Sequence, residues 1–415
     1  MDDFQQIIRE QVSELGRRWL IERITLKLSE VGVDAKPSLV TSIADQIIAD
    51  GGEGELTIEG EDSDERLANF TLEFTDEDLA DFDKAAAGYQ AKLNRVVVNF
   101  TTGEAARFFR TLKSKWPEEF ALQQKEMEEF RRNLEGRWGE GFGLLRTLLT
   151  CSREIGGDFA ARNARSKSRR NRSLHDVLMK LHARACQVTA ETITLMENGY
   201  ADGAMARWRT LYEIGVVARV IADGGDELAQ RYIAHQKVEA KLSLDEYHRC
   251  HVALGYKPFP KSKAKRIEAA NARVLEKYGK EFGSPYGWAA EHLKKKKPSF
   301  SELQLAAGRA EMASHFRMAS HGIHAGPQGM YFKLGLLGPK PSIISGASNA
   351  GFAEPAQNVA LTLAQVTSLL WPKHPGPFDL IWMKAFVLVR EAIPQALLRA
   401  DRKLKRDDAA VRRNR

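Results

Sequence analysis

Arg317, His321 and His324 (the Arg-His-His trio) follow one another at positions i, i+4 and i+7, so a helix would bring them to one face. A guanidinium binds phosphate and stabilises the added charge of a transition state. A histidine, whose ordinary pKa lies near neutrality, can move the proton of a ribose 2′-hydroxyl or of a leaving oxygen. These residue types form a minimal set for cleaving RNA by internal attack, without a metal or a cofactor.

The segment that must position the trio has the apolar pattern of a helix. Met312, Phe316, Ala319 and Ile323 recur at helical spacing and form an apolar face on nearly the opposite side from the trio. We therefore predict a helix over 301 to about 323, packed through that face. The trio then faces solvent, another domain or a partner subunit.

A second pair of charged residues lies inside a strongly apolar segment. The sequence LYEIGVVARVIA, residues 211–222, is typical of a buried helix, yet it contains Glu213, four residues after Arg209. A buried carboxylate must be paired, and Arg209 is the local partner. Two interpretations remain open: an ion pair that orients two helices, or a pair that lines a pocket.

Two segments carry a resemblance to a known family. ARWRTLYEIGVVARVI (206–221) and HFRMASHGIHAGP (315–327) are similar to a large family of uncharacterised bacterial helical proteins, domain of unknown function 5677. The resemblance covers roughly residues 170–404. It implies a helical bundle and assigns no activity.

The second segment also resembles, more distantly, the HEPN superfamily. Its ribonucleases carry an arginine followed four to six residues later by a histidine, and Arg317 and His324 have six residues between them. The residue after the arginine, usually polar in that superfamily, is Met318 here. The resemblance implies a metal-independent endoribonuclease, working as a toxin or phage-defence effector and often as a homodimer, with Arg317 on the phosphate and His324, assisted by His321, as acid or base.

The charge of the chain suggests a different kind of function. The net charge is +7, and basic residues gather at Arg169, Arg170 and Arg172 and in the run Lys294, Lys295, Lys296 and Lys297. Such basic patches attract RNA, other nucleic acids or an acidic protein surface, although many are only solvated helix ends. The alternative to an enzyme is therefore a non-catalytic helical module that binds a protein or nucleic-acid partner.

Several function classes lack their sequence motifs. The chain has no Walker phosphate loop, no HExxH zinc motif and no GxSxG nucleophile turn. Its three cysteines, Cys151, Cys186 and Cys250, are widely spaced, which fits neither a disulfide framework nor a zinc site. We expect no metal, no cofactor, no membrane segment and a cytoplasmic location.

The apolar period is helical almost everywhere, so we predict a mainly α multi-helix bundle. We expect an N-terminal helical region over 1–165, with an acidic insert at 51–84, and a C-terminal bundle over 166–415. Thr75 and Asp78 have the spacing of a capping box, which predicts a helix to about residue 94. Further helices are expected at about 104–115, 117–134 and 141–165. In the C-terminal bundle, helices are expected at 202–222 and 226–253, with Gly224 and Gly225 as the break between them. At most a small β hairpin is expected in the N-terminal half and near 330–337, where the short apolar run fits a strand or a hairpin.

Overall fold

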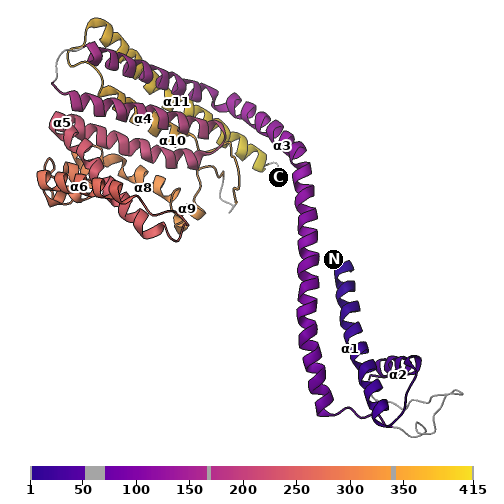
Figure 1. Cartoon of the computed structure of the whole chain (residues 1–415). Coiled ribbons are helices and arrows are strands. Elements are labelled where there is room, and N and C mark those ends of the chain that lie inside the picture. Colours follow the sequence, from indigo (N-terminus) through magenta and orange to yellow (C-terminus); the bar gives the residue numbers. More distant parts are fainter. Residues whose placement is uncertain (1, 52–70, 166–169, 338–342, 414–415) are drawn as a thin grey trace. The chain divides into compact units, whose positions relative to one another are not determined.

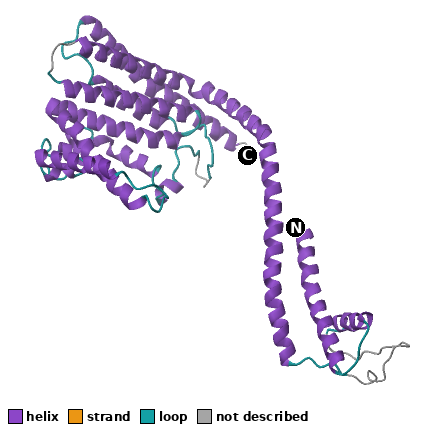
Figure 2. Cartoon of the chain, viewed as in Figure 1, coloured by secondary structure: helices purple, strands orange, loops and turns teal. Residues whose placement is uncertain are grey.

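The structure, a computed structural model, is mainly helical, and it describes residues 2–51, 71–165, 170–337 and 343–413 (Figure 1). Figure 2 shows helices, turns and loops in these ranges and no strand. The prediction of a mainly α fold is confirmed. The hairpin expected near 330–337 is wrong, because Pro327–Tyr331 forms helix α9 and a loop follows it. The other expected hairpin lies largely outside the described residues, as does most of the acidic insert.

Two compact units divide the chain, residues 1–122 and residues 123–415. The boundary falls within α3, Asp76–Arg165, a helix of 90 residues. The basic stretch 162–172 lies inside the second unit. None of the helices in the described part of the chain combines the length and the apolar run that crossing a bilayer needs.

The first unit packs α1, Asp2–Glu30, and α2, Pro37–Ala49, together with the start of α3. Its small core contains Ile24, Leu28, Val40 and Ile43, all at most 5% exposed. Every one of these residues belongs to α1 or α2, so apolar burial in this unit is modest.

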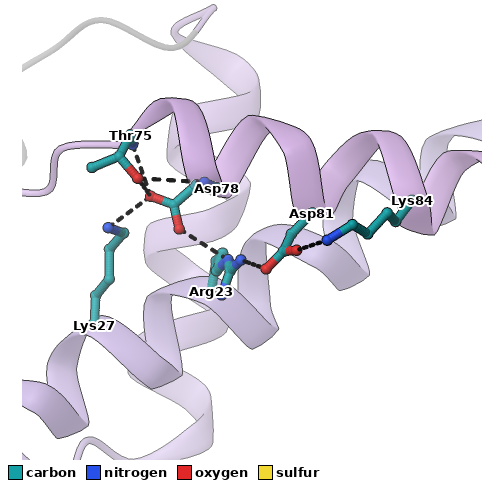
Figure 3. A network of polar contacts seen from close by, with 6 residues as sticks. All are labelled: Arg23, Lys27, Thr75, Asp78, Asp81 and Lys84. Carbon is teal, nitrogen blue, oxygen red and sulfur yellow. Dashed lines mark hydrogen bonds and ion pairs between the residues drawn. The ribbon is translucent and has the colours of Figure 1, made fainter.

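Charged contacts join the start of α3 to α1 (Figure 3). Asp78 accepts from the backbone N–H of Thr75 at 2.8 Å, and Thr75 Oγ1 caps the Asp78 N–H at 3.4 Å, which confirms the predicted capping box. The same carboxylate pairs with Lys27 at 2.8 Å and Arg23 at 3.0 Å, and Arg23 also contacts Asp81. The hydrogen bonds from Lys27 and Thr75 lower the pKa of Asp78 to about 2.

The four helices that the sequence predicted between residues 75 and 165 form the single helix α3. Thr101 and Ser114 lie just before the starts expected for the helices 104–115 and 117–134. Their hydroxyls bond instead to carbonyls of the preceding turn, Thr101 to Val97 and Ser114 to Thr111. Hydroxyls bonded in this way cannot cap a following helix, so the helix continues through Pro117.

The second unit is a bundle built around α5, Ala201–Cys250. Figure 1 shows α4 (Arg172–Glu197), α5, α10 (Ala353–Ser368) and α11 (Pro377–Arg413) side by side. Trp208 of α5 is fully buried, and its indole N–H donates to Thr362 Oγ1 of α10 at 3.0 Å. The later part of α3 contacts α11, since a Cβ on Gly141 would lie 2.5 Å from Leu397. Gly225, with φ +72°, interrupts α5 where the sequence predicts a break between helices.

A tight turn joins α4 to α5. The Gly199 N–H donates to the carbonyl of Met196, and the Tyr200 N–H donates to that of Leu195. This pattern is the Schellman motif, which needs a left-handed residue, and Gly199 has φ +87°. Glycine is also required by space, because a Cβ would lie 2.8 Å from the ring of Phe130.

The segment that carries the trio is more broken than the predicted helix 301–323. It consists of α7 (Phe300–Ala306), a short 3-10 turn (Ala310–Met312) and α8 (Ala313–His321). Gly308, with φ +64°, separates α7 from the turn. Before this segment in the sequence, α6 (Lys261–Tyr278) and the turns that follow it pack on the later part of α5. Buried Arg231 of α5 contributes to this packing, because its guanidinium donates to Glu291 at 2.6 Å.

His182 of α4 is a buried titratable group in this core. It is 2% exposed, and its Nε2 lies 3.2 Å from Thr367 Oγ1 of α10. Burial lowers the pKa of His182 to about 4. Between pH 6.5 and pH 4 the unfolded chain binds a proton that the folded chain does not, so stability falls as the pH falls through this window.

We predict that His182→Gln loses part of this pH dependence. The wild-type protein should lose about 3 kcal/mol more stability than the variant between pH 7 and pH 4. Urea unfolding at a series of pH values measures the difference. His292→Gln, an exposed histidine, is the control and should follow the wild type. Parallel curves for wild type and His182→Gln would contradict the assignment.

Candidate functional site

Helix α8 carries Arg317 and His321 and is anchored through its other face. The Phe316 ring packs against Tyr212 and Phe300, with ring centroids 5.4 and 5.0 Å apart. Ala319 is 1% exposed. Phe316 and Ala319 thus face the core, Met318 between them is half-buried, and Arg317 lies on the exposed side of the helix.

Arg317 is exposed, and it forms no hydrogen bond or ion pair within the described parts of the chain. His321, at the last position of α8, is half-buried. No carboxylate among the described residues pairs with either side chain. Both are thus available to an external anion.

His324 lies beyond the end of α8, although the sequence pattern places it on the same helix. A turn follows His321, in which the Ile323 and His324 N–H groups both donate to the carbonyl of Ser320 at 3.1 Å. His324 is exposed in this turn, and Ile323, assigned to the apolar face, is 47% exposed. The helix therefore presents Arg317 and His321, while the turn presents His324.

The turn is fixed by a close approach of two backbones. A Cβ on Gly329 of α9 would lie 2.0 Å from the carbonyl oxygen of His321 and 3.4 Å from that of His324. Only glycine allows α9 to pack this closely against the histidine turn. Sequence analysis missed Gly329, because nothing in the local pattern distinguishes it from other glycines of the loop.

A narrow crevice adjoins the trio. His321 lines it together with Asp202 from the start of α5 and Lys333 from the loop after α9. Its internal volume is about 20 Å³, room for one water molecule. Asp202 also accepts a hydrogen bond from the Leu334 N–H at 3.0 Å, which ties this loop to α5. Sequence analysis missed Asp202 and Lys333, since only tertiary packing brings them beside His321.

Arg209 and Glu213 form an ion pair at 3.2 Å on α5, with both side chains half-buried. Burial raises the pKa of the Glu213 carboxyl, and the charge of Arg209 opposes that rise. The Arg209 guanidinium also lies 4.5 Å from the centre of the Phe316 ring. Because Phe316 belongs to α8, this cation–π contact connects the ion pair to the helix that carries Arg317.

The two basic patches lie on other elements. Arg169 is outside the described residues, Arg170 is exposed, and Arg172 is exposed at the start of α4. The four lysines of the run 294–297 are exposed, and Lys295 pairs with Glu302 at 3.3 Å. Within the described ranges, no group of three or more His, Cys, Asp or Glu side chains is arranged to hold a metal ion.

We predict that Gly329→Ala disturbs the histidine turn. The added methyl group cannot fit against the His321 carbonyl, so α9 must shift, at a cost of about 1–3 kcal/mol. Thermal unfolding and hydrogen exchange of the peptides around residues 321–331 measure the effect. Gly326→Ala is the matched control, because a Cβ there has no neighbour within 4 Å. Equal exchange in the two variants would contradict the close approach.

Comparison with known proteins finds a family match for part of the second unit. Residues 175–340 match the model of a family of unknown function, DUF5677. No curated protein and no solved structure matches the chain significantly. The matched segment covers less than half of the chain and runs from α4 to the loop after α9, so it includes Arg209, Glu213 and the trio. Residues 175–340 are therefore similar to this family of unknown function, as the resemblance in the sequence predicted, although the match ends well before residue 404.

Proposed function

We propose that the second unit is a metal-independent, HEPN-like endoribonuclease that uses the Arg-His-His trio. The observation that carries this proposal is the state of Arg317: an exposed guanidinium with no carboxylate partner in the described structure, four residues before half-buried His321. An exposed guanidinium without a carboxylate partner can bind an external phosphate through two parallel hydrogen bonds. An unpaired one beside two histidines suits an RNA phosphate.

The chemistry proposed is cleavage by internal attack. The ribose 2′-oxygen attacks the adjacent phosphorus, and the bond from phosphorus to the 5′-oxygen breaks. Arg317 binds the phosphate and stabilises its extra negative charge. His324, assisted by His321, takes the proton of the 2′-hydroxyl or gives one to the leaving 5′-oxygen. The products are a 2′,3′-cyclic phosphate and a free 5′-hydroxyl.

The surface around the trio favours a polymeric substrate. The crevice beside His321 is too small for a metabolite, whereas small-molecule sites usually occupy several hundred Å³. Arg317 and His324 are exposed on α8 and on the turn after it. A strand lying across the surface can reach both, and Lys333 at the edge of the crevice adds positive charge. A nuclease of this kind would act on its own cell as a toxin or defence effector.

We predict that Arg317→Ala and His324→Ala each lower the rate of RNA cleavage by about 10²–10⁴-fold, the usual contribution of one such group. Purified wild type and variants are incubated with total cellular RNA in EDTA, and product ends are tested for cyclic phosphate. Since both side chains are exposed, the melting temperature should stay unchanged.

The controls for this experiment are Arg402→Ala on α11 and His292→Ala, which remove an exposed arginine and an exposed histidine elsewhere in the second unit. Both should retain full activity. Cleavage that persists in Arg317→Ala and His324→Ala, or that is absent from the wild type, would remove the ribonuclease proposal.

A non-catalytic binding module is the second candidate, and the exposed lysine run favours it. Lys294, Lys296 and Lys297 have no ion-pair partner among the described residues, and Lys294 stands in a left-handed conformation, φ +54°. A cluster of free ammonium groups on a loop suits a polyanion.

We predict under this second proposal that the triple change Lys294→Gln, Lys296→Gln and Lys297→Gln weakens binding to a single-stranded RNA and flattens its salt dependence. Fluorescence anisotropy across a salt series measures both, and the slope should fall by up to about 2, at about 0.7 per lost contact. A triple change at exposed Lys384, Lys403 and Lys405 is the control. Identical slopes for the two variants would argue against the lysine run.

A further inference from the structure

Part of α3 is a helix that nothing in the described structure covers. Every residue from 105 to 122 is exposed, over five turns of the helix. Most helical stability in proteins comes from packing one face against another element, and the stretch 105–122 has no such contact within the described structure. Pro117 makes this stretch weaker still, because it cannot donate the helical hydrogen bond of its turn.

The exposed stretch has an apolar face that is too large for an ordinary surface helix. Phe108, Phe109, Leu112, Trp116 and Phe120 are 48–65% exposed. At 100° per residue these five side chains fall within about a third of the helix circumference. The Trp116 and Phe120 rings lie 5.8 Å apart along this face. A contiguous aromatic stripe of this kind marks a surface that another element covers.

The charges of this stretch change sign along the helix. Arg107, Arg110, Lys113 and Lys115 make the first half basic, with no acidic residue between them. The second half is acidic, and its carboxylates are Glu118, Glu119, Glu126, Glu128 and Glu129, with one lysine, Lys125. The charges nearest the stripe follow the same order: Lys113 and Lys115 flank its first half, and Glu119 and Glu126 lie within or at the edge of its second half, whereas Arg107, Arg110, Glu118 and Glu128 lie on the far side. Arg110 and Lys113 are three residues apart, as are Glu126 and Glu129, so like charges are neighbours on the helix surface and destabilise it when it stands alone.

We propose that a second copy of this chain covers the stripe, with the two α3 helices antiparallel and crossing near Pro117. In this arrangement the basic half of each helix runs beside the acidic half of the other. A parallel pair would place like charges together instead. The pairing is the same from both sides, as two-fold symmetry requires. Aromatic residues supply the apolar contact, and the reversed charges set the direction.

The first experiment measures the mass of the full-length protein by sedimentation velocity. At about 10 µM, tenfold above a Kd of about 1 µM, the wild type should be mostly dimeric. The double variant Leu112→Glu with Trp116→Glu should be monomeric. The control is Ser114→Glu with Ala121→Glu, which adds the same charge to the opposite face of the same helix and should remain a dimer. A monomeric wild type, or a dimeric Leu112→Glu/Trp116→Glu variant, overturns the proposal.

The second experiment tests the direction of the pair with nitroxide labels, placed singly at Gly103→Cys or Glu118→Cys after replacing the three native cysteines. A Cβ at Gly103 meets no neighbour, so the label fits. In an antiparallel dimer that crosses at Pro117, the two labels at 118 are almost level along the helix axis, whereas the two at 103 are offset by about 40 Å along it, so the distance between labels is much longer at 103 than at 118. Equal distances at the two positions would mean a parallel pair and overturn the antiparallel arrangement.

Discussion

The enclosure of α5 is the constraint on which the rest of the second unit depends. Trp208 of α5 is buried against α10. Other residues of α5 contact each of the elements that surround the trio. Arg209 contacts the Phe316 ring of α8, and Asp202 binds the loop after α9. The Tyr212 hydroxyl donates to the carbonyl of Arg309, just before α8, at 2.6 Å. Arg317 therefore faces outward because Phe316, the residue before it, is held against α5.

Much of the fold could be predicted from the sequence because its signals are local. The helical apolar period, the capping pair Thr75 and Asp78, and the break at Gly225 depend on residues within one or two turns. The extent of α3 could not be predicted, since a threonine such as Thr101 can either cap a helix or bond backwards, and the sequence does not decide between them. The loop at 330–337 looked like a hairpin because a short apolar run is compatible with either structure.

In the candidate site, too, features set by local helical spacing could be predicted, and features set by tertiary contacts could not. The outward direction of Arg317 and the pairing of Arg209 with Glu213 follow from helical spacing, and both are present in the structure. The place of His324 depends on where α8 ends, and that end is fixed by the contact of Gly329 with the carbonyl of His321. Two backbone segments can come this close only because Gly329 has no side chain. Residue type alone cannot reveal it.

The turn at Gly199 has a consequence for the order in which the second unit assembles. It closes α4 against α5 with only a few residues between the two helices, so little chain entropy is lost when they meet. The indole of Trp208 must instead find Thr362, 154 residues further along the chain. Contacts between near neighbours form early in folding, and distant ones form late. The α4–α5 hairpin would thus be the nucleus, and α10 would complete the core by docking onto it.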